Sequence, residues 1–124
     1  MVQKMKEKYL YRIKIGKFLI NTWHLTPFTS EETGVNVRIW ISYRQCIFKP
    51  FLIVAQDLDS IRKNGIIISI EKRPKILSPK GKAIKPKVLK QLYLWIRLNR
   101  KALYMLWSEK IVLMDFSLDL MKKI

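Results

Sequence analysis

Apolar side chains recur along the chain with two different spacings, and these spacings predict its secondary structure. Residues 9–15 and 36–42 alternate apolar with polar positions, a period of two that is typical of β-strands. Residues 51–55 form a continuous apolar run, which fits a strand covered on both faces or a buried helical turn. Residues 66–70 are almost all β-branched and predict a further strand. We therefore expect an antiparallel sheet within residues 9–70.

Polar and turn-forming residues separate these apolar segments. Residues 21–34 contain Pro27 and a Thr/Ser cluster, which predict a loop or a short helix. Residues 57–63 are mostly polar and lead into a turn at Asn64-Gly65. Residues 72–86 carry many cations and several prolines, so we expect a basic loop there.

The second half of the chain has a helical spacing. Pro86 suits the first turn of a helix, and no Gly or Pro interrupts residues 87–107. At 100° per residue the apolar positions fall within roughly 140° of arc, a stripe wide enough to pack on the sheet. This stripe contains Val88, Leu89, Leu92, Trp95, Ile96, Ala102, Leu103, Leu106 and Trp107. A second short helix is expected over residues 111–121, with Asp115 and Asp119 exposed and Leu113, Phe116 and Leu120 facing inward.

These elements predict an α+β fold in which a small antiparallel sheet is covered by a long C-terminal amphipathic helix. The chain has 124 residues and is 49% hydrophobic, enough for one domain over residues 1–124 with a real core. No apolar stretch approaches the 18 residues of a membrane span. A basic N-terminus lacks a signal-peptide core, and Cys46 is the only cysteine, so we expect a cytoplasmic protein.

The charge is strongly unbalanced. Lys and Arg number 25 against 9 Asp and Glu, which gives a net charge of +16. Such a field attracts a polyanion or an acidic protein. A composition bias is the alternative explanation, because Lys outnumbers Arg 18 to 7.

Cations and aromatic rings share one side of the predicted helix. We call this side the basic strip, and it contains Lys90, Tyr93, Arg97, Arg100, Lys101 and Tyr104. Cations neutralise phosphates and rings stack on unpaired bases, so the strip predicts a surface for nucleic acid. Cations before and at the start of the helix would extend it, namely Lys80, Lys82, Lys85 and Lys87. The alternative is a solvated helix face whose tyrosines cover the edge of the core.

A third side of the same helix is apolar. Leu94, Leu98 and Met105 lie between the basic strip and the core stripe. They are expected to be covered by the C-terminal segment folding back, or by a partner chain or a second copy.

Catalytic groups are sparse. His24 is the only histidine, and Glu31-Glu32 are adjacent and poorly placed as an acid/base pair, so we expect no catalytic residue, metal or cofactor. One enzyme class stays open, a metal-independent ribonuclease that holds a phosphate with Arg97, Arg100 and Tyr104.

Residues 66–110 contain several short motifs, namely Ser69-Ile70-Glu71, Pro74 to Leu77, Gly81-Lys82, Trp95 to Arg100 and Trp107-Ser108-Glu109. In these motifs the chain resembles a family of small uncharacterised bacterial proteins. The resemblance implies a compact α+β domain and a two-gene, toxin–antitoxin-like pair. Relatives carry an Asp-His-x-Pro-Pro-His motif that is absent here, so its role is not transferred.

The sequence thus predicts a non-catalytic basic protein that binds nucleic acid or an acidic protein partner. A ribonuclease-type toxin and a diverged protein without retained function are the alternatives.

Overall fold

The computed structural model describes residues 12–15, 18–21, 25–42, 50–79 and 84–124. The strands are β1 (Arg12–Ile15), β2 (Phe18–Asn21), β3 (Leu25–Phe28), β4 (Ile39–Ser42), β5 (Phe51–Val54), β6 (Ile66–Ser69) and β7 (Ile76–Ser78). The helices are α2 (Ser30–Thr33), α3 (Leu58–Asn64), α4 (Pro86–Trp107) and α5 (Leu113–Asp115), followed by the π-helical segment η2 (Phe116–Leu120).

Five strands form an antiparallel sheet in the order β3-β4-β5-β6-β7, so each strand pairs with its neighbour in sequence. Ile53 lies opposite Ile67 and Leu52 opposite Ile68, which places β-branched side chains across the central pair. Strands β1 and β2 form a separate antiparallel hairpin. The fold is therefore α+β with a small antiparallel sheet and one long helix, as the sequence predicts.

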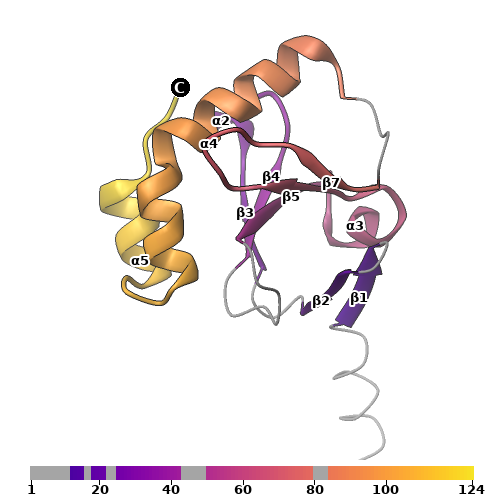
Figure 1. Cartoon of the computed structure of the whole chain (residues 1–124), viewed down its shortest axis with the longest axis horizontal. Helices are drawn as coiled ribbons and strands as arrows, with labels where there is room; N and C mark the ends of the chain where they lie inside the picture. Colours follow the sequence, from indigo (N-terminus) through magenta and orange to yellow (C-terminus); the bar gives the residue numbers. More distant parts are fainter. Residues whose placement is uncertain (1–11, 16–17, 22–24, 43–49, 80–83) are drawn as a thin grey trace, which may run out of the picture.

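The alternation of side chains along the strands gives the sheet two buried faces. One face packs with α4 and η2, and its sheet residues include Phe28, Ile39, Ile41, Leu52, Val54, Ile66 and Ile68. The opposite face packs with the β1–β2 hairpin and α3, and includes Trp40, Phe51, Ile53 and Ile67. Figure 1 shows these layers, with α4 above the sheet and the hairpin and α3 below it. Strand β5 lies in the centre of the sheet and is buried on both faces. All four of its residues are therefore apolar.

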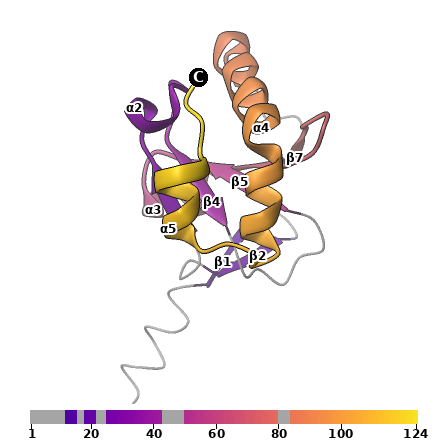
Figure 2. The ribbon, with the colours of Figure 1, turned by 90° about the vertical axis from the view of Figure 1, so that its left-hand side faces the viewer.

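Helix α4 begins at Pro86, as predicted, and runs without interruption to Trp107. Its buried side chains are Val88, Leu92, Trp95, Ile96, Asn99, Leu103 and Leu106. The helix bends near its middle in Figure 1: the first half crosses the sheet and the second half runs beside α5. Figure 2 shows α4 and α5 side by side from the adjoining direction.

A second short helix was predicted over residues 111–121, and the structure has α5 and the π-helical segment η2 over residues 113–120, with one side chain placed differently. Phe116 is fully buried and meets Phe28 edge to face, with ring centroids 5.9 Å apart. Asp115 and Asp119 are exposed as expected. Leu120, expected to face inward, is 38% exposed, because the π-helical turn of η2 spaces side chains differently from an α-helix.

The end of the chain is tied to two other elements. The backbone N–H of Ile124 donates to the carbonyl of Thr33 at 2.9 Å, beside Gly34, which ends α2 in the left-handed conformation. The backbone N–H of Lys122 donates to Oδ1 of Asn99 in α4 at 2.6 Å. The C-terminal segment therefore connects α4 to α2 through hydrogen bonds.

Four segments differ from the sequence prediction. Residues 25–28, expected in a loop or helix, form β3, since Pro27 is tolerated on an edge strand. Residues 58–64, expected to be a polar connection with a turn, form α3, whose N-cap is Asp57. Strand β7 lies inside the expected basic loop, and β2 is an additional strand. No described helix is long and apolar enough to cross a membrane.

Candidate functional site

The basic strip lies on the solvent side of α4, opposite the residues that pack on the sheet. Lys90, Arg97 and Lys101 are exposed, and Arg100 is half-buried. The bend of the helix leaves Arg97 and Lys101 outside the core. Lys85 and Lys87 are also exposed at the N-terminal end, whereas Lys80 and Lys82 lie outside the described residues.

The two tyrosines of the strip differ in exposure. Tyr104 is 41% exposed, so part of its side chain is open to a ligand. Tyr93 is half-buried and packs against the core beneath α4, and burial raises the pKa of its phenol. Tyr93 thus serves partly as a cover for the core, and Tyr104 is the more accessible ring.

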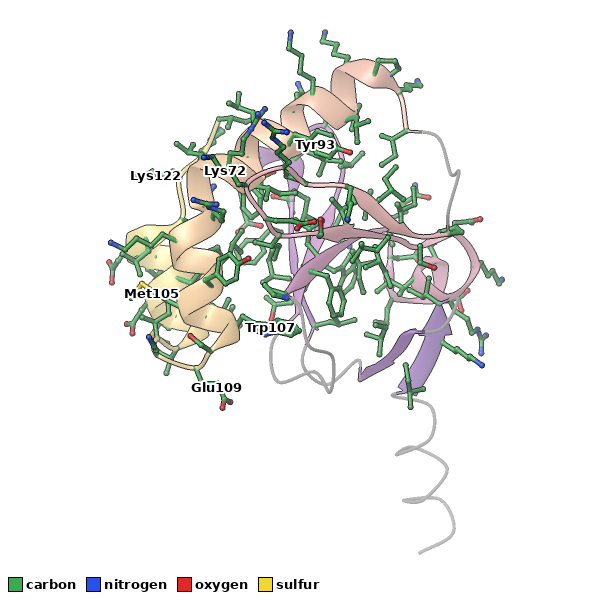
Figure 3. All side chains as sticks on the ribbon, in the orientation of Figure 1. Lys72, Tyr93, Met105, Trp107, Glu109 and Lys122 are labelled. Atoms are coloured by element: carbon green, nitrogen blue, oxygen red, sulfur yellow. The ribbon has the colours of Figure 1, made fainter. Side chains whose placement is uncertain are left out.

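The turn between β6 and β7 brings a second group of cations to the same region. Lys72, Arg73 and Lys75 are exposed. The turn passes beside the middle of α4, and Lys72 and Tyr93 mark the two elements in Figure 3. The sequence placed these cations in a loop but could not show which side of the helix they would join.

A hydroxyl network fixes this turn and occupies its carboxylate. Ser69 is buried, and its hydroxyl donates to Oε2 of Glu71 at 2.6 Å. The same hydroxyl oxygen accepts from the backbone N–H of Lys75 at 3.0 Å. Ser69 therefore fixes the position of Glu71, whose carboxylate is the one negative charge beside Lys72, Arg73 and Lys75 in residues 71–75.

The surface of the protein also carries an ion pair outside the basic strip. The ion pair formed by Lys63 and Asp59, at 3.7 Å, lies on the surface of α3, away from α4. No cation of the basic strip belongs to that pair. The exposed cations of the strip therefore present positive charge to solvent.

A depression with a volume of about 490 Å³ lies at the C-terminal end of α4. Its wall contains the cations Arg100, Lys101 and Lys110, the rings of Tyr104 and Trp107, and Ser108. Trp107 is anchored by an edge-to-face contact with Phe51, with centroids 5.6 Å apart. The apolar spacing predicted Trp107 in the core stripe. Ser108 and Lys110 were not predicted as site residues, because only the turn that follows the helix brings them to the depression.

The apolar side of α4 remains largely open. Leu94 is 51% and Leu98 is 44% exposed, whereas Met105 is half-buried and also borders the depression. Figure 3 shows Met105 on the side of α4 that faces α5. The C-terminal segment folds back as one alternative expected, yet it leaves both leucines uncovered. Coverage of Leu94 and Leu98 by a partner chain stays a prediction.

The remaining candidate groups serve the fold or fall outside the described ranges. Glu32 closes a capping box with Thr29 at the start of α2, with the Thr29 N–H donating to Oε1 at 2.9 Å. His24 and Cys46 lie outside the described residues. Among the residues described, no three His, Cys, Asp or Glu side chains are grouped so that they could hold a metal.

Comparison with known proteins finds no matching family model, no matching curated protein and no matching solved structure. The resemblance of residues 66–110 to small bacterial proteins stays a prediction. Function must therefore be argued from the surface of α4 itself.

Proposed function

We propose that the protein binds single-stranded nucleic acid through the basic strip, without cleaving it. The observation that carries this proposal is the joint placement of exposed cations and an exposed ring on one side of α4. Cations neutralise the phosphates of a strand, and tyrosine rings stack on bases that are not paired.

The rings favour nucleic acid over an acidic protein as the ligand. Carboxylates would be attracted by Arg97, Arg100 and Lys101 alone, whereas Tyr104 adds a stacking surface that bases use and carboxylates do not. An acidic protein would instead gain from apolar contact, which Leu94 and Leu98 offer beside Lys90 and Lys101. A protein partner encoded by a paired gene would bind in this way. The test below separates binding of an acidic protein from binding of nucleic acid.

Binding is measured by fluorescence anisotropy with a labelled 12-nucleotide RNA or DNA strand and with the matching duplex. For single strands, the logarithm of the affinity falls linearly with the logarithm of the salt concentration, with a slope of about −0.7 for each neutralised phosphate. With roughly four phosphates contacted, raising salt from about 50 to 200 mM should weaken binding roughly 50-fold. The double variant Arg97→Glu/Lys101→Glu should lower the logarithmic salt slope by about 1.4, since two contacts are lost.

The matched control is Lys14→Glu/Arg62→Glu, which makes the same charge change in β1 and α3, on the other side of the sheet. It should bind more tightly than the strip variant and keep the salt slope of the unmodified protein. The proposal would be rejected if both variants weakened the binding of nucleic acid equally, or if the affinity did not depend on salt concentration. Equal competition by poly-L-glutamate would assign the surface to acidic proteins, and RNA shortened in EDTA would assign a ribonuclease.

A further inference from the structure

The depression at the end of α4 is built by the way this helix terminates. The backbone N–H of Lys110 donates to the carbonyl of Met105 at 2.8 Å, and that of Glu109 donates to Leu106 at 3.1 Å. Glu109 adopts a left-handed φ of 61°. This is the Schellman arrangement of a helix C-terminus, and it turns the chain so that Lys110 lines the same depression as Arg100 and Lys101.

The same arrangement provides hydrogen-bond donors for the carbonyl groups at this end of the helix. A helix C-terminus is normally unfavourable for an anion, because its last carbonyl groups point outward. Here the Tyr104 carbonyl accepts from both the N–H and the hydroxyl of Ser108, at 2.9 and 2.8 Å. The carbonyls of Met105 and Leu106 are also bonded, as described above. Three of the last four carbonyl groups of α4 are therefore bonded, and the charged side chains that line the depression are the cations Arg100, Lys101 and Lys110.

Among the described residues that line the depression there is no carboxylate. Glu109, the acidic residue of the turn, extends away from the helix at the bottom of the molecule in Figure 3. Three cations thus face one space, and the exposed ring of Tyr104 borders it. An anionic ligand with a flat apolar part matches these two properties.

The size of the depression limits that ligand. Its volume of about 490 Å³ is in the range of small-ligand sites, roughly 300–1,000 Å³, and it suits one nucleotide rather than a duplex. Trp107 is fixed against Phe51, so this wall of the depression is rigid.

The geometry points to a nucleotide subsite at this end of the basic strip. One nucleotide of a bound strand lies in the depression, with its phosphate on Arg100, Lys101 and Lys110 and its base against the ring of Tyr104. This inference rests on the proposed function and adds to it a position where the protein contacts a base and not only phosphates.

The test compares two 12-nucleotide strands with the same phosphates, oligothymidylate and a fully abasic strand. The protein should bind oligothymidylate at least about fivefold more tightly, the lower end of what one stacked base contributes. In Tyr104→Ala this ratio should fall toward one. Tyr104→Phe keeps a ring and should preserve the ratio, and circular dichroism confirms that both variants fold.

The outcomes separate the subsite from the proposed function. Equal affinity for both strands, with salt dependence intact, would overturn the subsite and leave the function standing. A ratio above five that Tyr104→Ala does not change would also overturn it. Absence of binding to either strand would overturn both. A further outcome is that free AMP binds saturably, that Tyr104→Ala abolishes this binding, and that oligothymidylate is not preferred over the abasic strand. This outcome would make the depression a site for free nucleotides and would overturn the assignment to a strand.

Discussion

Asn99 is a buried polar residue in the middle of the apolar stripe of α4. Its Nδ2 donates to the carbonyl of Trp95 at 3.0 Å and to that of Lys122 at 2.9 Å, and its Oδ1 accepts from the N–H of Lys122. The amide therefore links the helix to a segment 23 residues later in the chain. A side chain that bonds the carbonyl four residues earlier also favours a local bend, which agrees with the curved course of α4.

Replacing this amide should loosen the C-terminal segment. Asn99→Ala removes three hydrogen bonds at a site that is 2% exposed, and we expect a loss of about 1–3 kcal/mol in the free energy of unfolding. Urea denaturation followed by circular dichroism measures this loss. Asn64→Ala, at the exposed last residue of α3, is the matched control and should change stability much less. Similar losses in the two variants would show that the link to Lys122 contributes little.

Elements with a strong period were predictable, and short elements held by tertiary contacts were not. The stripe of α4 follows directly from apolar spacing, whereas the continuous apolar run of β5 was compatible with a strand or a buried helical turn. Strand β3 was hidden by Pro27, which the edge of the sheet accommodates. Helix α3 buries only Ile61, so no apolar period marks it, although Asp57 was a readable N-cap. The depression depends on the turn at Glu109, a left-handed position usually signalled by glycine.

The N-cap of α3 should make the stability of the protein depend on pH. Asp57 accepts from the backbone N–H of Ser60 at 2.7 Å, and this hydrogen bond lowers the pKa of the carboxyl from 3.8. A lowered pKa gives stability that is present above the unfolded-state pKa and is lost as pH falls through the folded-state value. Asp57→Asn keeps a capping side chain without the charge. The stability difference between the protein and this variant should therefore shrink as pH falls below the ordinary carboxyl pKa of 3.8 and through the lowered folded-state pKa.

Urea unfolding at several acid pH values measures that difference. Asp119→Asn removes the same charge from η2 and reports the general effect of one carboxylate. A difference for Asp57→Asn that stays constant with pH would contradict the role of the charged cap.

At the scale of the whole molecule, the net charge of +16 opposes the compact state, because like charges are brought together on folding. Salt screens this repulsion over about 10 Å at 0.1 M. Salt should thus stabilise the fold while it weakens the binding of nucleic acid. These opposite directions distinguish a loss of binding from a loss of structure.

Thermal unfolding in roughly 50 and 500 mM NaCl tests the electrostatic contribution to stability, and Tm should rise with salt. The triple variant Lys14→Gln/Lys122→Gln/Lys123→Gln lowers the net charge from +16 to +13, since three cations are removed. Its Tm should rise less with salt than that of the unmodified protein. A Tm that falls with salt in both proteins would show that attraction between charges outweighs their repulsion.

The order of the elements has a consequence for synthesis on the ribosome. The isoleucine-rich face of the sheet is complete once β6 has emerged, but the helix that covers it begins at Pro86 and contributes core residues as far as Leu106. During that interval a β-branched segment such as Ile66–Ile68 is free to pair with other nascent chains. A polypeptide stalled before α4 would expose this face, and chaperones and proteases act on surfaces of that kind.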